Sequence, residues 1–352
     1  MAAAAPDAVL VATRGPQARV ILRELARLEP RPVLVSGLPG ISIPATRKAL
    51  VFRHQADLFV VHSHREVREF RALATQNGWN RPIALARLPF AAQHGAREPV
   101  VPGGADLVFA VQSIVPVELA ERRRVARLLL RAADAMPERR VVVKVRAVAG
   151  ERQTHDEAHP IPELIAAEAR EAGRPVPTNL VVSSASMSAA LDSAGGLVTV
   201  SSTAAIEAIS RGIPVIALDV FGVSDALINT VFSGSGLFGG EDEVVGRRFR
   251  HPSATWLSDN YFHRGGDDLQ QRMTELVAAR HADELVRRDG LPVMGGSIRH
   301  RWQRGRAFPG SERSVRGLLV AVVGYPARAV AVASRRVTRP IRVRLRPSDQ
   351  RP

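Results

Sequence analysis

The sequence predicts an α/β protein built from two Rossmann-like lobes with parallel sheets. Short apolar runs alternate with longer amphipathic stretches along most of the 352 residues, which is the pattern of parallel β-α-β units. Residues 93–105 interrupt this alternation with Pro and Gly, so we interpret them as a linker between two lobes. Ligands of such sheets bind at the carboxyl ends of the strands, so we expect the site in a cleft between the lobes.

The first lobe covers residues 1–92 and starts with an apolar run typical of a buried strand. Its expected strands are residues 8–13, 32–37, 57–63 and 82–89, and its expected helices are residues 17–28, 45–55 and 64–78. A single strand precedes the segment PVLVSG at 32–37. The lobe is therefore short: either a β-α unit is truncated at its start, or the lobe is simply small.

The second lobe covers residues 106–266 and repeats the same alternation. Its expected strands are residues 106–112, 141–146, 179–184, 197–201 and 214–219, with helical patterns at 116–136 and 161–173. These strands are almost continuously apolar, as expected when helices cover both faces of the sheet. A closing helix is predicted within residues 267–290, and residues 291–352 form a basic, Arg-rich tail.

Composition excludes several classes of protein. The chain has no cysteine, which rules out disulfides, thiolate metal sites and cysteine nucleophiles. The net charge is +15, but about half of the surplus lies in residues 311–352, and no nucleic-acid-binding module accompanies it. The apolar stretch 317–333 is interrupted by Pro326 and Arg328 and is too short to span a bilayer. We expect a cytoplasmic protein without a specific nucleic-acid partner.

The basic tail leaves two interpretations open. Residues 311–352 mix apolar runs with ten arginines, a composition that can lie on an anionic membrane surface. A disordered basic tail explains the same residues. In the first case the protein would be peripheral to the inner face of the membrane.

A cluster of hydroxyls follows the strand at 197–201. Ser201, Ser202 and Thr203 stand at the start of a helical pattern, and Glu207 follows one turn later. Hydroxyls and free backbone N–H groups at such a turn suit a phosphate, while an acidic residue near a nucleotide site can bind the ribose. A plain helix cap with a surface glutamate is the alternative.

This segment resembles the donor-binding segment of GT-B glycosyltransferases and of related nucleotide-sugar epimerases. With SGLPGISIP (36–44), VHSHRE (61–66), KVRAVAGERQTHDE (144–157) and WLSDNYFH (256–263), the chain resembles an actinobacterial glycosyltransferase family of unknown specificity. The resemblance covers residues 8–290. It implies a GT-B-like fold and a nucleotide-sugar donor, with the phosphates at the hydroxyl cluster and the ribose at Glu207.

Two cations and a polar loop follow the strand at 141–146. Lys144 and Arg146 stand at the strand's carboxyl end, where cations can neutralise a diphosphate leaving group without a metal. Many GT-B enzymes have a histidine in this segment, and this chain has none there. Gln153, Thr154 and His155 belong to the next loop, which we expect to overhang the cleft; a divalent-metal site there is less favoured because no HExxH spacing is present.

The first lobe offers a glycine turn and two histidines. Gly37 and Gly40 would let the backbone approach a ligand closely. His62 and His64 are the candidate general bases for the acceptor hydroxyl, since histidine titrates near neutral pH, and Glu66 could orient the ring. Structural roles for all of these residues are the alternative.

Further polar residues follow the strand at 214–219. Asp219 and Ser224 are placed to contact the sugar ring beside the phosphates, and Asn229 is a weaker candidate. Asn260 and His263 are cleft candidates without an assigned role.

These observations favour a metal-independent glycosyltransferase without a further cofactor. We expect the donor to be a CMP-nonulosonate or a UDP-sugar, and the acceptor to be a glycan or a lipid-linked acceptor. A nucleotide-sugar epimerase of the same fold is the nearest alternative. A non-catalytic protein that binds nucleotide sugars, membranes or nucleic acid is the alternative from another class.

Overall fold

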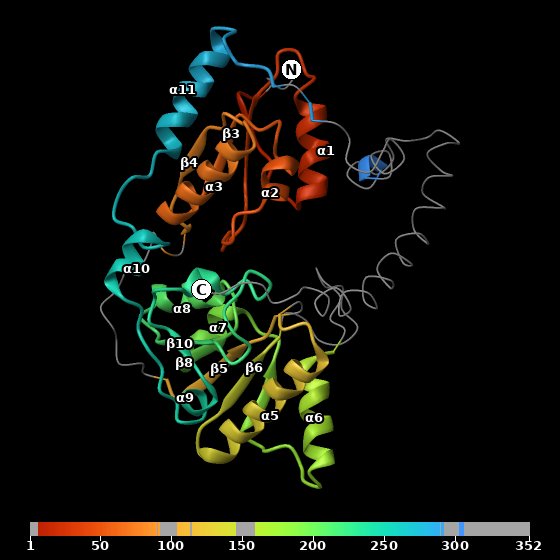
Figure 1. The fold of residues 1–352 in the computed structure, drawn as a ribbon, viewed down its shortest axis with the longest axis vertical. Helices are drawn as coiled ribbons and strands as arrows, with labels where there is room; N and C mark the ends of the chain where they lie inside the picture. Colours follow the sequence, from red (N-terminus) through yellow and green to blue (C-terminus); the bar gives the residue numbers. More distant parts are fainter. Residues whose placement is uncertain are drawn as a thin grey trace, which may run out of the picture.

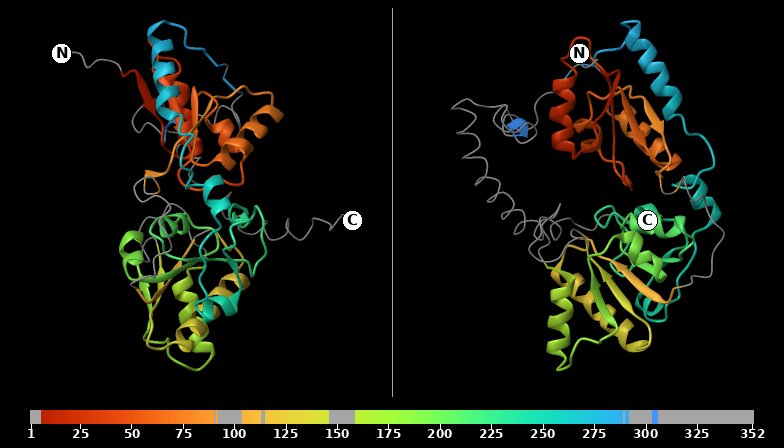
Figure 2. Two further views of the ribbon diagram at one scale, coloured as in Figure 1. Left: turned by 90° about the vertical axis from the view of Figure 1, so that its left-hand side faces the viewer. Right: turned by 180° about the vertical axis from the view of Figure 1, so that it is seen from behind.

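The protein forms two α/β lobes, one above the other (Figures 1 and 2). The computed structural model describes residues 6–89, 91, 104–112, 115–145, 159–288, 290–291 and 303–305. The first lobe, here the N-lobe, contains a four-stranded sheet, and the second, the C-lobe, contains a six-stranded sheet. All paired strands of both sheets are parallel, so the predicted pair of Rossmann-like lobes is confirmed.

The N-lobe sheet winds in one direction only, with the strand order β1-β2-β3-β4. Its elements are β1 (Ala8–Leu10), α1 (Gly15–Leu25), β2 (Val33–Gly37), α2 (Arg47–Phe52), β3 (Leu58–Val61), α3 (His64–Gln76) and β4 (Ile83–Leu85). Right-handed crossovers that all step the same way place their helices on one face of the sheet. Leu34 of β2 and Phe59 and Val61 of β3 face these helices.

The opposite face of this sheet is covered by α11 (Leu269–His281), far along the chain. Val33, Val35, Leu58, Val60 and Ala84 point to that face, and the side chains packed against them include Leu269, Met273, Leu276, Val277 and Leu285. Figures 1 and 2 show α11 and α1 on opposite sides of the N-lobe strands. The closing helix therefore completes the N-lobe core, although it follows the C-lobe in sequence.

The C-lobe sheet winds in both directions, with the strand order β10-β9-β8-β5-β6-β7. Its elements are β5 (Asp106–Ala110), α5 (Leu119–Ala135), β6 (Val141–Lys144), α6 (Ile161–Glu171), β7 (Leu180–Ser183), α7 (Met187–Asp192), β8 (Ala194–Thr199), α8 (Ala204–Ser210), β9 (Val215–Leu218), the 3-10 helix η1 (Thr230–Phe232), β10 (Phe238–Gly239), α9 (Glu241–Val245) and α10 (Ala254–Asp259). Helices therefore cover both faces.

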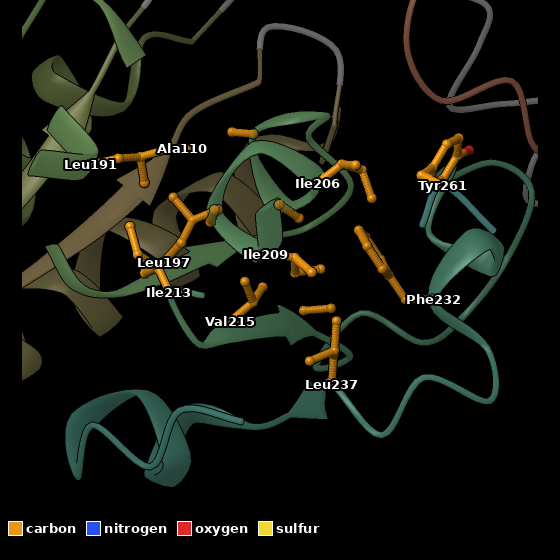
Figure 3. Packing of buried hydrophobic residues seen from close by; sticks show 14 of the residues in the cluster. Ala110, Leu191, Leu197, Ile206, Ile209, Ile213, Val215, Phe232, Leu237 and Tyr261 are labelled. Atoms are coloured by element: carbon orange, nitrogen blue, oxygen red, sulfur yellow. The ribbon is translucent and has the colours of Figure 1, made fainter. Parts of the chain in front are cut away.

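Alternate residues of the C-lobe strands enter two separate cores. Leu107, Phe109 and Val143 pack with α5 and α6, whereas Val108 and Val142 pack with α7 and α8. The second cluster is shown in Figure 3, where Ile209 of α8 lies close to Val215, and Ile206 of the same helix lies near Phe232 and Tyr261 at the cluster's edge. This two-residue period is the geometry of a strand buried on both faces.

No helix in the described ranges is long and apolar enough to cross a membrane. Within the same ranges, no group of three or more His, Asp and Glu side chains is arranged to hold a metal ion. The metal-independent chemistry expected from the sequence stays a prediction.

Candidate active site

The hydroxyl cluster is held by a glutamine at the end of the neighbouring central strand. Gln112, two residues after β5, accepts a hydrogen bond from Ser201 N–H through Oε1 at 2.8 Å and donates from Nε2 to Ser201 Oγ at 3.0 Å. Ser201 is buried. Its side chain is thus committed to the protein, and it fixes the turn rather than facing a ligand in this structure.

Gln112 is itself fixed by a buried arginine. Arg122 of α5 is 1% exposed, and its Nη1 donates to the carbonyl oxygen of Gln112 at 3.1 Å. Burial lowers the pKa of the Arg122 guanidinium to about 10, which still leaves it charged at neutral pH. Arg122 therefore fixes the backbone of the glutamine that holds the hydroxyl turn.

Ser202 and Thr203 begin α8 and are half-buried. Ser202 Oγ accepts from Ala204 N–H at 3.2 Å, which satisfies one of the unpaired donors at the helix start. Thr203, Glu207 and Arg211 follow at intervals of four residues and share one face of the helix. Glu207 Oε1 pairs with Arg211 Nη2 at 3.5 Å, so its carboxylate lies along the helix in this structure.

The glycine turn of the N-lobe contacts the hydroxyl cluster of the C-lobe. A Cβ atom placed on Gly40 would lie 2.7 Å from Thr203 Oγ1, and Gly40 adopts φ +67°. Both the contact and the left-handed backbone require glycine here. Gly37 has a different reason to be glycine, since a Cβ there would lie 2.7 Å from the carbonyl oxygen of Val60 in β3.

Lys144 lies at the carboxyl end of β6, and its side chain is buried. It pairs in register with Ala110 of β5 and Ser183 of β7, and its Nζ donates to the carbonyl oxygen of Val145. Because Lys144 follows Val142 by two residues, it belongs to the sheet face covered by α7 and α8. Two strand spacings, roughly 10 Å, separate β6 from β8, which leads to the hydroxyl cluster.

Both ring nitrogens of His62 contact backbone carbonyl oxygens. Nδ1 lies 2.8 Å from the oxygen of Ala86, and Nε2 lies 3.1 Å from the oxygen of Leu38. Carbonyl oxygens only accept hydrogen bonds. A neutral ring has one N–H and can donate to only one of them, but both nitrogens are directed at backbone oxygens in this structure, so neither is placed to accept a proton from a substrate hydroxyl. The two contacts connect the glycine turn to the end of β4.

Glu66 is fully buried and connects three segments of the chain. Its Oε1 accepts from Ser42 N–H at 2.9 Å and from Tyr261 Oη–H at 2.8 Å, and Oε2 accepts from His62 N–H at 2.7 Å. Burial raises the pKa of this carboxyl, and the three hydrogen bonds act in the opposite direction. In this structure Glu66 holds the glycine turn and the segment returning from the C-lobe.

His64 is half-buried at the start of α3, and its ring lies next to His263. The ring centroids are 4.8 Å apart. His263 Nδ1 contacts the carbonyl oxygen of Gly265 at 2.9 Å, so the proton belongs on Nδ1 in the neutral ring. His263 Nε2 is then a buried acceptor, and it has no hydrogen-bond partner in the described part of the chain. Burial lowers the pKa of His263.

The residues predicted to contact the sugar organise a loop after β9. Ser224 N–H donates to Asn229 Oδ1 at 2.9 Å, and Asn229 Nδ2 donates to the carbonyl oxygen of Gly222 at 2.9 Å. Asn229 is fully buried, whereas Asp219 is half-buried at the strand end. Arg146, Gln153, Thr154 and His155 lie outside the described residues.

The structure thus brings Gly40 and Thr203 into contact, and His62 and Glu66 hydrogen-bond to the same glycine turn. The ring of His64 lies instead beside His263 and Gly266. Sequence reasoning missed Gln112 and Tyr261. A polar residue that directly follows the apolar strand at 106–110 is the signal that marks Gln112. Tyr261 had no comparable signal, because its role depends on a contact between residues 195 positions apart.

A family described as "Putative glycosyltransferase (DUF6716)" matches residues 1–276, which include both lobes and the first half of α11. The chain belongs to this family. Its two Rossmann-like lobes with parallel sheets are the architecture that the sequence predicts. No curated protein sequence matches the chain.

Several solved structures are distantly similar to this family member. They include accessory secretory protein 1, 2 and 3 of Streptococcus pneumoniae, with 13% identity, a TM-score of 0.42, and coverage of 76% of this chain and 53% of that chain. The pneumococcal O-GlcNAc transferase GtfA in complex with UDP and GlcNAc is 15% identical, with a TM-score of 0.39 and coverage of 75% of this chain and 50% of that chain. CalG4, the calicheamicin glycosyltransferase, is 15% identical, with a TM-score of 0.38 and coverage of 79% of this chain and 76% of that chain. The chain spans about half the length of the first two.

Proposed function

We propose that this chain transfers a sugar from a nucleotide-activated donor to a hydroxyl of a glycan or lipid-linked acceptor, without a metal ion. The contact between Gly40 and Thr203 is the observation that carries this proposal. It joins two turns that stand at the carboxyl ends of two different parallel sheets, which is where such sheets bind ligands. A donor bound there would touch both lobes at once.

The phosphates of the donor are assigned to Ser202, Thr203 and Lys144, with Arg146 as a further cation. The hydroxyls donate to phosphate oxygens, and the ammonium group neutralises charge on the departing nucleotide. A UDP-sugar and a CMP-nonulosonate both fit this chemistry. Glu207 is assigned to the ribose, and Asp219 and Ser224 to the sugar.

His64 is assigned as the general base. The acceptor oxygen forms a bond to the anomeric carbon while the bond from that carbon to the phosphate oxygen breaks, and the nucleotide leaves with the bonding electrons. His64 accepts the proton that the acceptor hydroxyl loses. The unpartnered Nε2 of His263 beside it would stabilise the resulting imidazolium, a task that His62 cannot share while both its nitrogens contact carbonyls.

Nucleotide binding tests the donor site. A panel of UDP, GDP, CDP, CMP and their sugar conjugates is titrated into the wild type, Ser202→Ala/Thr203→Ala and Ser186→Ala, with thermal stability as the readout. Ser186 also caps a short helix, but three strands away from β8, so its loss controls for cap stability. We expect one nucleotide class to stabilise the wild type and Ser186→Ala but not the double variant.

Two outcomes would overturn parts of this proposal. If no nucleotide stabilises the wild type, the donor site is wrong. If the donor is converted at full rate without any acceptor, the reaction is an epimerisation rather than a transfer.

A membrane-linked acceptor is proposed from the charge of residues 311–352. Ten arginines against two acidic residues would attract an anionic bilayer surface. Sedimentation with vesicles of phosphatidylglycerol and of phosphatidylcholine tests this, since only the anionic vesicles should bind the full chain. Equal binding to both vesicle types, or to neither, contradicts it.

A further inference from the structure

A pocket of about 530 Å³ opens between the lobes at the side where the chain returns to the N-lobe. Its N-lobe wall is the first half of α3, and its C-lobe wall is formed by residues 233–234 and by α10 with Asn260. Ser201, Thr203 and Gly40 do not line it. The pocket is therefore separate from the phosphate site proposed above, and its volume is in the range of small-molecule sites.

The charges around the pocket are balanced in pairs. Arg65 Nε lies 2.8 Å from Glu69 Oε1, and Arg68 makes two hydrogen bonds to the carboxylate of Asp259, at 2.6 and 2.7 Å. Two cations and two anions leave no net charge on the wall. The pocket thus favours a neutral ligand that can both donate and accept hydrogen bonds, since phosphates and carboxylates would meet Glu69 and Asp259.

The floor of the pocket combines an aromatic ring with an unsatisfied amide. Trp256 is buried and anchored by its indole N–H on the carbonyl oxygen of Val231, at 2.8 Å. Asn260 is 1% exposed; its Nδ2 donates to the carbonyl oxygen of Trp256 at 2.9 Å, but its Oδ1 has no partner in the described part of the chain. A buried acceptor without a donor is costly, and a ligand hydroxyl would supply that donor after a small shift.

The residue assigned as general base, His64, does not line the pocket but directly precedes its first lining residue in sequence. Arg65 follows His64 directly, and it bridges to the C-lobe through the carbonyl oxygens of Thr230 and Val231, at 3.1 and 3.3 Å. The bond from Arg68 chiefly lowers the pKa of Asp259, and the charges of His64 and Arg65 contribute as well. His64 is therefore close enough to the pocket to act electrostatically on its wall.

We propose that this pocket binds one or two neutral sugar residues of the acceptor glycan, with the reacting hydroxyl directed to His64. This rests on the proposed transfer reaction. Sugars carry several hydroxyls that each donate and accept, which matches a wall of paired charges, exposed hydroxyls and one unsatisfied amide oxygen. A binding site shared by both lobes also makes acceptor binding sensitive to how the lobes are held together.

Saccharide binding without donor tests the pocket. Glucose, galactose, N-acetylglucosamine, maltose and lactose are titrated into the full chain, up to about 50 mM because weak sites have millimolar Kd values, with ligand-observed NMR as the readout. Thr255→Trp and Ser233→Trp place an indole in the pocket from two exposed positions on its wall. Ser258→Trp is the matched control, since Ser258 is exposed on the same helix but is not part of the wall.

We expect at least one neutral saccharide to bind, and both pocket variants to weaken it by about tenfold or more, which corresponds to 1.4 kcal/mol. Ser258→Trp should change it less than about twofold. Failure of all saccharides to bind, equal effects of the three variants, or tighter binding of glucose 6-phosphate than of glucose would overturn the assignment. UDP binding is measured on the same samples: if it persists while saccharide binding is absent, only the acceptor pocket is wrong.

Discussion

Both faces of each sheet are covered, but the two lobes differ in which segments cover them. The C-lobe sheet winds outward from β5 in both directions, so its own crossover helices cover both faces. The N-lobe sheet winds in one direction, and its crossover helices cover one face only, so the other face depends on α11. Strand order therefore decides which lobe is formed by one continuous segment of the sequence. The C-lobe is one segment, whereas the N-lobe is two.

Removing α11 is the most severe test of this comparison. In a chain ended after residue 265, five largely apolar sheet positions lose their cover, among them Val33 and Leu58. At about 1.5–3 kcal/mol for each large buried side chain, the loss is comparable to the whole stability of a domain, which is about 5–15 kcal/mol. Hydrogen exchange should show an unprotected N-lobe and a protected C-lobe.

A chain ended after residue 291 is the control for that truncation. It keeps α11 and Leu285, and the N-lobe should retain its protection. Equal protection of the N-lobe in both truncated chains would contradict the role given to α11.

Removing the buried carboxylate tests how the lobes are joined. Glu66→Ala leaves the donors Ser42 N–H, His62 N–H and Tyr261 Oη–H without their acceptor. Because an unsatisfied buried donor costs about 1–3 kcal/mol, we expect the free energy of unfolding to fall by about 3 kcal/mol or more in urea titrations. Glu69→Ala on the same helix removes a half-exposed ion pair and should cost less than about 1 kcal/mol. A similar decrease in the free energy of unfolding in both variants would contradict the special role given to Glu66.

Alanine variants of Gly40 and Gly78 distinguish the effect of backbone strain from the effect of the contact between the lobes. Gly40 and Gly78 have nearly equal φ angles of +67° and +66°, but only Gly40 has an atom within 4 Å of an added Cβ. Alanine at either position should cost about 1–2 kcal/mol from the left-handed backbone. Only Gly40→Ala should also weaken nucleotide binding, by about tenfold, as measured by calorimetry. A comparable loss of affinity in Gly78→Ala would show that the effect is strain alone.

The smallest effect is expected in the pH dependence of stability. Burial lowers the pKa of His263 in the folded chain, while the unfolded value is about 6.5. Below that value the unfolded chain binds the proton that the folded chain rejects, so the free energy of unfolding falls as the pH drops from 7 toward 5. His263→Gln should reduce this slope in urea titrations at several pH values. Part of the slope should remain, because burial also lowers the pKa of His251; an unchanged slope would be inconsistent with a proton-poor His263.

The fold follows from local pattern to a large extent. The apolar runs at 32–37 and 57–63 became β2 and β3, and the amphipathic stretch at 64–78 became α3 (His64–Gln76). The placement of α11 could not be predicted in this way. Its periodicity predicts a helix. Which face of which sheet it covers depends on the strand order, and local sequence pattern does not encode that order.

The site follows from sequence less completely. The hydroxyls at 201–203 and the turn around Gly40 were identified from strand ends alone, and they meet in the structure. The sequence predicts His62 as a general base and Glu66 as the residue that orients its ring, yet their polar atoms contact backbone groups and Tyr261. A residue type suited to catalysis is equally suited to satisfying buried backbone groups, and only tertiary contacts distinguish the two uses.

The return of the chain to the N-lobe also decides which part of the enzyme a tether would hold. Val286 O accepts from Arg31 and Leu291 O accepts from Arg23, so the described residues 286–288 and 290–291 lie on the N-lobe. The basic segment is therefore preceded in sequence by residues that contact the N-lobe rather than the C-lobe. If that segment were anchored, the N-lobe would be the tethered lobe, and the C-lobe would be the one free to move relative to it.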